Sequence, residues 1–461
     1  MSYEKALYFL VALQILVWTI LPTVLRHSLP MDAVEGYVWG QMWQFGYDRN
    51  PWLNAWLTAL AIKIGGSWLV YLFSQLSVAA CFIAVWQLGK KILNLKYALI
   101  AVLLLVGIQY YNLASVDFND NVLEIGLWML TTLYFYSACK EHKTSAWLLT
   151  GLFAGLAMMA KYYTLVLLLS MLMFLLANKS ARKNLFNAST YLGCLIFLII
   201  ILPHAWWLSN HNFATINYAL IRISDNLQNS IAHFALVQLL ALILPTLLFL
   251  WLLIGDKSQP KSAKIALSSF DKMFLLIMAL GPYLLTLTLA LFFNMTLHAL
   301  WGTPLLSLWP LTIVAFTQPQ FNAQQFRRFL IAVAIVFSAF AIGYSYAILS
   351  CGYGSSANYP AYEIAHYIEQ QWYQNHQSKI INVVGDRYTA GNFAYFAKDH
   401  PKVIIVDDAH PDIPKTSEAT IFIWRAEQPL KLPKNLELIT TKDFHWKRNH
   451  DKLPCTIGFA F

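Results

Sequence analysis

Long apolar runs are the feature that most limits what this chain can fold into. A bilayer core is about 30 Å thick, so one helical crossing needs about 20 mainly apolar residues. About eleven runs of suitable length occur before residue 350. They cover residues 6–25, 67–89, 97–113, 120–138, 145–160, 162–177, 186–206, 231–254, 272–293, 299–316 and 329–349. We therefore expect a mainly α-helical, polytopic membrane protein.

The composition agrees with this class. Hydrophobic residues make up 58% of the chain and charged residues only 12%, about half of the charged share of a soluble domain. A net charge of +9 would suggest a nucleic-acid partner in a soluble protein. Here the basic residues are confined to particular loops, so no nucleic-acid partner is implied. The first run lacks an Ala-x-Ala cleavage site, which favours an uncleaved first span.

The distribution of basic residues predicts the orientation. Alternate loops hold most of the Lys and Arg residues, and cytoplasmic loops are the ones enriched in these residues. We therefore expect a cytoplasmic N-terminus in the inner membrane of a cell and an extracytoplasmic C-terminal part. The basic residues concerned are Lys90, Lys91, Lys96, Lys140, Lys143, Lys179, Arg182, Lys183, Lys257, Lys261, Lys264, Lys272, Arg327 and Arg328.

The composition changes to that of a soluble domain after residue 350. Short β-branched runs at 380–384, 403–406 and 421–424 predict strands, and 389–398 has helical character. We expect residues 1–350 to form a transmembrane catalytic domain and 351–461 a small extracytoplasmic α/β domain, interpreted as a structural cap or acceptor-docking surface. Cys351 and Cys455 would both face an oxidising compartment and could form a bridge.

The first outer loop, residues 31–53, carries several charges beside a span. Asp32 and Glu35 are three residues apart, so they share one face of a helix. Asp48 and Arg49 lie in GYDRNP, which reads as a turn. The aromatic stretch 52–64 is too short to cross and is expected to lie in the membrane interface. The span centres are almost free of charge, whereas transporters place ionisable groups there.

The remaining outer loops add further polar candidates. Lys161 follows an apolar helix in which Gly151 and Gly155 would permit close helix approach. Taken alone, Lys161 could be a snorkelling lysine, and the aromatic residues could form an interfacial belt. The candidates in these loops are Asp120, Asn121, Lys161, Tyr162, His204, Arg222, His298 and Trp301.

Six motifs in order resemble the GT-C class of membrane glycosyltransferases, in particular the protein O-mannosyltransferase and aminoarabinose transferase relatives. They are MDAVEGYVWGQ, GYDRNPWLNAWL, DFNDNVLEIGLW, GLAMMAKYYTLVLL, PHAWWLSNHNF and HALWGTPLL. The resemblance implies transfer of a sugar from a polyprenyl-phosphate carrier to a lipid or protein acceptor outside the cytoplasm. The family's adjacent Asp-Glu pair is replaced here by Asp32 and Glu35, and its usual second-loop Asp aligns with Asn121, beside Asp120.

These residues permit a displacement at the anomeric carbon of the sugar. The leaving group is a phosphate, so a cation that stabilises its developing charge is what helps most. Lys161 suits that role, with Arg49 or Arg222 assisting. Asp32 and Glu35 are the catalytic candidates for deprotonating an acceptor hydroxyl, and for an acceptor phosphate they would instead orient substrate.

No cofactor is implied. Paired acids could hold a divalent ion, but the sequence has neither a His-x-x-x-His motif nor a carboxylate-rich cage. The alternative function is a flippase for lipid-linked glycans, which the number of spans favours and the uncharged span centres disfavour. A third is a non-catalytic scaffold that uses the outer domain.

Overall fold

The computed structural model describes residues 2–224, 230–255, 263–350, 355–406, 419–433, 436, 438–448 and 454–461. Its contacts divide the chain into two compact units. The first contains Met1–Trp18, Gln44–Asn54 and Leu72–Ala341. The second contains Thr19–Trp43, Ala55–Tyr71 and Ile342–Phe461. The domain boundary at residue 350 stays a prediction from composition.

The described part of the chain has seven helical segments long and apolar enough to cross a membrane, or nine if two bent pairs each count as one span. The bent pairs are α5 (Leu95–Leu105) with the 3₁₀ turns η1 (Gln109–Tyr111) and η2 (Ala114–Val116), and α8 (Thr164–Ala177) with α9 (Lys179–Arg182) and η3 (Lys183–Phe186). The other seven are α1 (Tyr3–Leu25), α4 (Ser67–Ile92), α6 (Asp120–Glu141), α10 (Ala188–Asn210), α12 (Ser230–Ala241) with α13 (Ile243–Leu253), α14 (Ser269–Phe293) and α16 (Ala323–Ser350).

The polytopic, mainly α-helical class is confirmed, but the count of eleven spans is not. The fifth run forms α7 (Thr144–Ala160), whose 17 residues are at the short limit for a crossing. The tenth run is interrupted by turns after η4 (Ala299–Gly302), and only α15 (Trp309–Thr317) is α-helical. Pro310 stands in the first turn of α15, where a missing N–H costs nothing, so it marks a helix start.

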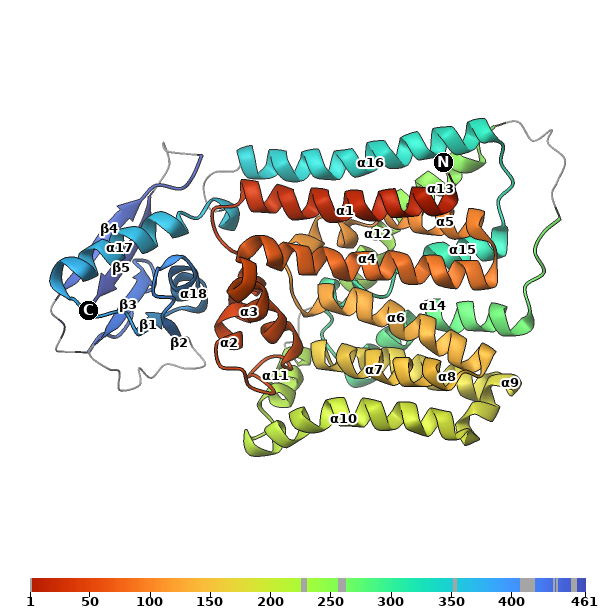
Figure 1. The fold of residues 1–461 in the computed structure, drawn as a ribbon, viewed down its shortest axis with the longest axis horizontal. Coiled ribbons are helices and arrows are strands. Elements are labelled where there is room, and N and C mark those ends of the chain that lie inside the picture. Colours follow the sequence, from red (N-terminus) through yellow and green to blue (C-terminus); the bar gives the residue numbers. More distant parts are fainter. Residues whose placement is uncertain are drawn as a thin grey trace. The chain divides into compact units, whose positions relative to one another are not determined.

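Helices of the first unit pack with their backbones almost in contact. α7 lies between α6 and α10, and α8 packs against α14 (Figure 1). A Cβ atom on Gly151 would lie 2.0 Å from the carbonyl oxygen of Gly193 in α10, and one on Gly155 would lie 3.0 Å from Ile200. The predicted role of Gly151 and Gly155 in close helix approach is therefore confirmed.

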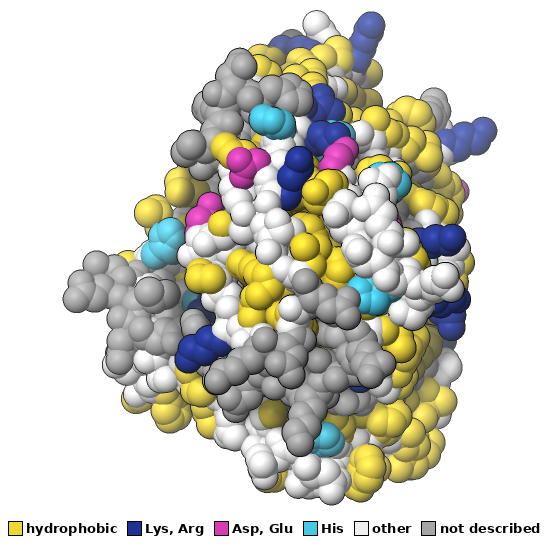
Figure 2. Space-filling view, turned by 90° about the vertical axis from the view of Figure 1, so that its left-hand side faces the viewer, with side chains coloured by type: hydrophobic (Ala, Val, Ile, Leu, Met, Phe, Trp, Pro, Cys, Tyr) yellow, Lys and Arg dark blue, Asp and Glu magenta, His cyan; other side chains and the backbone are white. Residues whose placement is uncertain are grey.

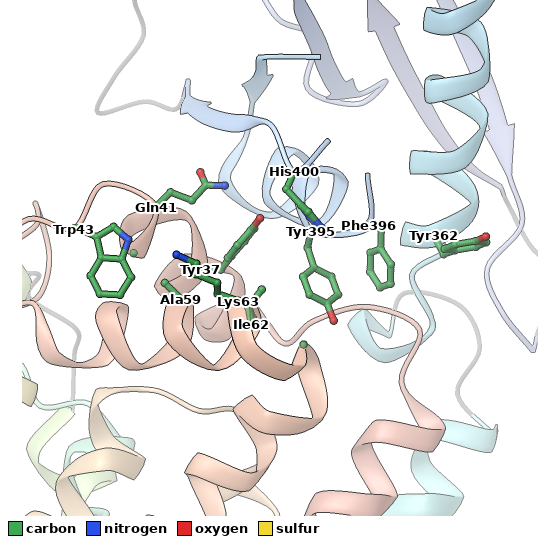
Figure 3. A pocket seen from close by; sticks show the side chains of 12 residues that line it. Tyr37, Gln41, Trp43, Ala59, Ile62, Lys63, Tyr362, Tyr395, Phe396 and His400 are labelled. Atoms are coloured by element: carbon green, nitrogen blue, oxygen red, sulfur yellow. The ribbon is translucent and has the colours of Figure 1, made fainter. Parts of the chain in front are cut away.

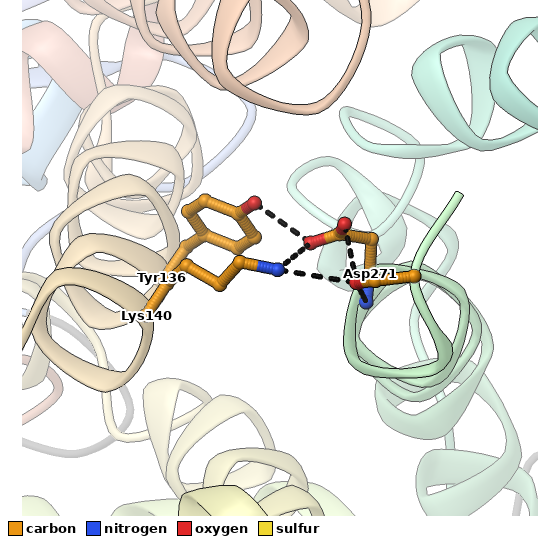
Figure 4. Close-up of polar contacts among 4 residues, drawn as sticks. Tyr136, Lys140 and Asp271 are labelled. Atoms are coloured by element: carbon orange, nitrogen blue, oxygen red, sulfur yellow. Dashed lines mark hydrogen bonds and ion pairs between the residues drawn. The ribbon is translucent and has the colours of Figure 1, made fainter. Parts of the chain in front are cut away.

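One end of α6 carries a polar cluster that joins it to α14. Asp271 Oδ1 accepts hydrogen bonds from Tyr136 Oη at 2.8 Å and Lys140 Nζ at 3.1 Å (Figure 4). The hydroxyl of Ser268, the N-cap of α14, donates to Asp271 Oδ2 and accepts from the Asp271 N–H. The bond from the Asp271 N–H satisfies one of the N–H groups that the first turn leaves open. The cluster also fixes the start of α14 beside the end of α6.

The same end gathers basic residues from several predicted loops. Lys91 and Lys143 both pair with Glu141, and Lys90 Nζ lies 3.9 Å from Glu4 Oε1 near the N-terminus. The start of α1 and the ends of α4 and α6 therefore meet. This matches the alternation on which the predicted orientation depends.

The second unit contains a five-stranded sheet of order β2-β1-β3-β5-β4. β2 (Lys402–Ile405), β1 (Asn382–Gly385) and β3 (Thr420–Arg425) are parallel, whereas β5 (Cys455–Ala460) is antiparallel to β3 and to β4 (Ile439–Phe444). The small α/β domain is confirmed, with three strands and α18 (Arg387–Phe396) close to their predicted places. β4, β5 and α17 (Ala361–Asn375) were not predicted, because β4 alternates weakly and α17 is rich in polar and aromatic residues.

Alternating side chains give the sheet two apolar faces. Val383, Ile421 and Phe459 pack with α17 and α18, whereas Val384 and Phe422 pack on the opposite face with Leu430, Leu432 and Leu436. Acidic, basic and hydrophobic side chains are interspersed on the face of the molecule that Figure 2 shows. Such mixing is typical of a surface in contact with water.

Two helices from the first outer loop belong to the second unit. A Cβ atom on Gly391 of α18 would lie 2.3 Å from Val34 of α2 (Met31–Gly40). A Cβ atom on Gly40 would lie 2.4 Å from Ala59 of α3 (Leu53–Gly65), the helix found where the interfacial stretch was predicted. The two glycines therefore let α2 pack tightly against both α18 and α3.

The predicted bridge between Cys351 and Cys455 gains no support. Cys351 lies outside the described residues. Cys455 is a buried free thiol in β5, and burial raises the pKa of this thiol to about 11.

Candidate active site

The start of α6 and the end of α7 bring a carboxylate and an ammonium group together. Asn119 caps α6 by accepting a hydrogen bond from the Val122 N–H, which places Asp120 in the first turn. Lys161 is the residue that follows α7. Its Nζ lies 3.1 Å from Asp120 Oδ2 and also donates to Asn121 Oδ1. The pair is mostly withdrawn from solvent, with 13% of each side chain exposed.

The helix ends suit the charges they carry. A helix N-terminus stabilises a negative charge and a C-terminus a positive charge, each by about 0.3–1 kcal/mol at exposed sites. Asp120 is at the positive end of α6, and Lys161 is at the negative end of α7. Lys161 Nζ also lies 5.7 Å from the ring centroid of Trp301, within the range of a cation–π interaction.

Glu124 is a buried acid beside this pair that the sequence analysis missed. It lies one turn after Asp120 on the same side of α6, and its Oε1 accepts a hydrogen bond of 2.8 Å from the Thr164 hydroxyl. Its Oε2 has no hydrogen-bond partner among the described residues. The four-residue spacing from Asp120 in DNVLE is the signal that could have found it.

Trp301 links this pair to the fifth outer loop. Its ring centroid lies 5.0 Å from that of His298 and 6.3 Å from that of Tyr163, which directly follows the predicted site residue Tyr162. Candidates from three separate predicted loops, Asp120 with Asn121, Lys161, and His298 with Trp301, are therefore neighbours within the first unit.

A second cluster forms where residues 44–54 meet α10 and α11 (Ala214–Ile223). His204 Nδ1 donates 2.6 Å to the carbonyl oxygen of Phe45, and Tyr162 Oη is hydrogen-bonded to His204 Nε2. A carbonyl can only accept, so Nδ1 carries a proton and Nε2 of a neutral ring accepts from Tyr162. Two predicted site residues, Tyr162 and His204, thus hold the first-loop turn.

The turn itself is tightly packed. A Cβ atom on Gly46 would lie 2.4 Å from the Trp207 ring and 2.9 Å from the His204 ring. The Thr215 hydroxyl donates 2.5 Å to the Tyr47 carbonyl oxygen. The next two residues are the predicted candidates Asp48 and Arg49, which are both half-buried.

Two cations lie at or near α11. The Arg49 guanidinium lies 5.4 Å from the ring centroid of Tyr218, so α11 positions it. Arg222 is exposed in the last turn of α11, and the backbone of the following residue, Ile223, accepts a hydrogen bond from Thr296. That bond ties α11 to the loop that carries His298.

Asp32 and Glu35 lie on α2 in the second unit and are both half-buried. Glu35 forms an ion pair with Arg387, with 15% of the Glu35 side chain and 6% of the Arg387 side chain exposed. The Arg387 guanidinium also lies 5.1 Å from the ring centroid of Trp39. Arg387 is the first residue of α18, capped by Asp386, and was not predicted to contact any site residue.

No group of three His, Cys, Asp or Glu residues within the described ranges is arranged to hold a metal ion.

Comparisons with known proteins agree with these features. The family described as "Dolichyl-phosphate-mannose-protein mannosyltransferase" matches residues 49–207. The lipopolysaccharide core galacturonosyltransferase RgtA of Rhizobium johnstonii is 22% identical over 427 residues, which cover 89% of this chain and 84% of that protein. The lipopolysaccharide core galacturonosyltransferase RgtB of the same organism is 26% identical over 195 residues, which cover 41% of this chain and 39% of that protein.

Solved structures share the fold. ArnT from Cupriavidus metallidurans bound to undecaprenyl phosphate has a TM-score of 0.70 and 13% identity, over 100% of this chain and 98% of that one. The same protein in the apo state has a TM-score of 0.68 and 14% identity over the same shares.

Proposed function

We infer from these relations that the chain is a membrane glycosyltransferase of the GT-C class, and we propose that it transfers a sugar from a polyprenyl-phosphate carrier to an extracytoplasmic acceptor. RgtA, a named glycosyltransferase, is related over most of both chains, and the fold is that of an ArnT solved with undecaprenyl phosphate. Neither these relatives nor the matching family is a flippase, so the alternative function gains no support.

The pairing of Lys161 with Asp120 is the observation that supports the mechanism best. In the transfer, the acceptor oxygen forms a bond to the anomeric carbon while the bond from that carbon to the phosphate oxygen breaks. Polyprenyl phosphate leaves with an additional negative charge. A preorganised ammonium group in a site with little water stabilises such a charge far better than solvent does. Lys161, 13% exposed, fits this role.

An acceptor hydroxyl must also lose its proton, and we propose that Asp32 removes it. Glu35 is the weaker candidate, because its carboxylate is already held in an ion pair with Arg387. If the acceptor group is itself a phosphate, no base is needed, and Asp32 instead orients the substrate.

The charged residues at the two ends of α6, Asp120 and Lys140, support the proposed orientation. Asp120 and Lys140 are twenty residues apart on this helix, about 30 Å at 1.5 Å per residue, which equals the thickness of a bilayer core. The Lys140 end gathers basic residues from several loops, as expected of the cytoplasmic surface. The Lys161 site would then lie at the opposite, extracytoplasmic surface of the inner membrane.

The names of the relatives favour a lipopolysaccharide acceptor, with protein and other envelope glycans as alternatives. The test compares the lipid A, lipopolysaccharide core and glycoprotein mass spectra of a deletion strain with those of its parent. We expect the core or lipid A to lose one sugar mass, restored by the wild-type gene. Unchanged spectra in all three fractions would contradict the proposal.

A variant separates transfer from flipping. Asp32→Asn should abolish turnover while the purified protein still binds undecaprenyl phosphate. A flippase would tolerate the change, and the modified glycan would remain in the spectra of the variant strain.

A further inference from the structure

The second unit contains a cavity of about 580 Å³ that the proposed chemistry does not use. Its volume is within the range of about 300–1,000 Å³ that small-molecule sites occupy. The lining comes from α2, α3, α17 and α18 together with the segments that follow α2, α3 and α18 (Figure 3). Elements far apart in the sequence therefore converge on it.

Aromatic rings form much of the wall. Tyr37 meets Tyr395 edge to face with ring centroids 6.1 Å apart, and Phe396 lies 4.7 Å from Tyr395 and 6.3 Å from Tyr362. Figure 3 shows Tyr37, Tyr395, Phe396 and Tyr362 in succession along the cavity. Ring faces of this kind pack against the apolar C–H face of a sugar, and Tyr hydroxyls bond to its polar edge.

The wall is held in place by hydrogen bonds to the backbone. Gln41 Nε2 donates to the Pro401 carbonyl oxygen at 3.2 Å, and its Oε1 accepts from the Val403 N–H at 3.1 Å. Tyr395 Oη accepts from the Ser67 N–H at 2.9 Å. The cavity is thus formed before any ligand enters, which lowers the entropic cost of binding.

The ionisable lining residues point to an anionic ligand. Lys63 is exposed and has no hydrogen-bond or ion-pair partner among the described residues. His400 Nδ1 donates to the Ala394 carbonyl oxygen. Burial raises the pKa of Tyr37, which keeps its hydroxyl protonated and able to donate. None of the twelve lining residues is an Asp or a Glu, so no lining carboxylate neutralises the ammonium group.

We propose that this cavity binds an anionic sugar residue of the acceptor, with Lys63 on its carboxylate or phosphate group and the aromatic rings on its ring face. The inference rests on the proposed transferase function and names the acceptor chemistry. The acceptor is favoured over the donor because four of the twelve lining residues, Tyr362, Tyr395, Phe396 and His400, belong to the sheet domain, whereas a polyprenyl tail must stay in hydrocarbon. Lys63 is a binding residue for the acceptor in this scheme and takes no part in the chemical step.

The test uses the full-length protein in nanodiscs and two probes. One is the core oligosaccharide released by mild acid from the deletion strain, and the other is undecaprenyl phosphate. Binding is measured for wild type, Lys63→Gln, Lys63→Arg and Tyr362→Ala, with Lys402→Gln as the matched exposed lysine outside the cavity. We expect Lys63→Gln to weaken oligosaccharide binding about tenfold, as loss of one charge-assisted hydrogen bond does.

Lys63→Arg should retain most of the affinity for the oligosaccharide, because it keeps the positive charge. Tyr362→Ala should bind the oligosaccharide several-fold more weakly, because it removes an aromatic ring from the wall. Lys402→Gln should bind it as wild type does. Oligosaccharide whose phosphates are removed and carboxylates reduced should bind equally weakly to wild type and Lys63→Gln. Weakened binding of undecaprenyl phosphate alone would make this a donor site, and no binding of the oligosaccharide by wild type would also overturn the proposal. Because binding is measured without turnover, failure of the transferase function remains a separate result.

Discussion

Lys161 Nζ lies 3.1 Å from Asp120 Oδ2, so the cation proposed to receive the carrier phosphate already has a carboxylate partner. An incoming phosphate must compete with Asp120 for this ammonium group. The pair thus keeps a buried charge compensated when no substrate is bound, which would otherwise be costly.

Asp120→Asn tests this competition. Removing the carboxylate leaves Lys161 without a full counter-charge, so the free energy of unfolding without ligand should fall by about 2 kcal/mol. Undecaprenyl phosphate should then stabilise the variant more than it stabilises wild type. The measurement is the thermal unfolding midpoint with and without this lipid. An equal ligand-induced shift in both proteins would contradict the competition.

Glu35 is predicted to act through structure. Glu35→Gln breaks its ion pair with Arg387, which should lower the unfolding free energy by about 3 kcal/mol and leave kcat within a few-fold of wild type. The double variant Glu35→Arg with Arg387→Glu should recover part of the stability. If Glu35 were the base, kcat of Glu35→Gln would fall by about 10²–10⁴-fold, and that result would contradict the structural assignment.

Gly46→Ala should destabilise the first-loop turn. The added methyl group would lie 2.4 Å from the Trp207 ring, and overpacking of this kind costs about 1–3 kcal/mol. Gly343→Ala in α16 is the control, since a Cβ there meets nothing within 4 Å and a helical Gly-to-Ala change favours folding. Unfolding midpoints of the two variants should shift in opposite directions, and a stabilised Gly46→Ala would show that the turn is loosely packed.

Activity should largely survive EDTA. The proposed leaving-group stabilisation comes from an ammonium group, and the described residues offer no cluster suited to a divalent ion. The measurement is sugar transfer by the purified protein before and after dialysis against the chelator. Complete loss that added Mg²⁺ or Mn²⁺ restores would assign the charge stabilisation to a metal.

Most of the long apolar helices and three of the five strands were predictable, because each depends on local hydrophobic periodicity. The roles of the polar candidates stay predictions. The specific contacts between residues distant in the sequence were not predictable. Glu35 and Arg387 belong to segments more than 300 residues apart, and only tertiary packing brings them together. Glu124 was missed because it lies within the predicted span 120–138, whereas the polar candidates were sought in the loops. The tenth run was predicted as a span, since hydropathy does not reveal the turns that interrupt it.

Transfer by Lys161 variants tests the central claim most directly, with Lys143 as the control. These two lysines flank α7 at opposite ends, and Lys143 is 64% exposed. The assay follows sugar transfer from an undecaprenyl-phosphate-linked donor to lipopolysaccharide by purified wild type, Lys161→Met, Lys161→Arg and Lys143→Met. Lys161→Met should lower kcat by about 10²–10³-fold, as loss of one charge-stabilising group does, while Lys161→Arg keeps partial activity and Lys143→Met is normal. Wild-type turnover by Lys161→Met would contradict the account.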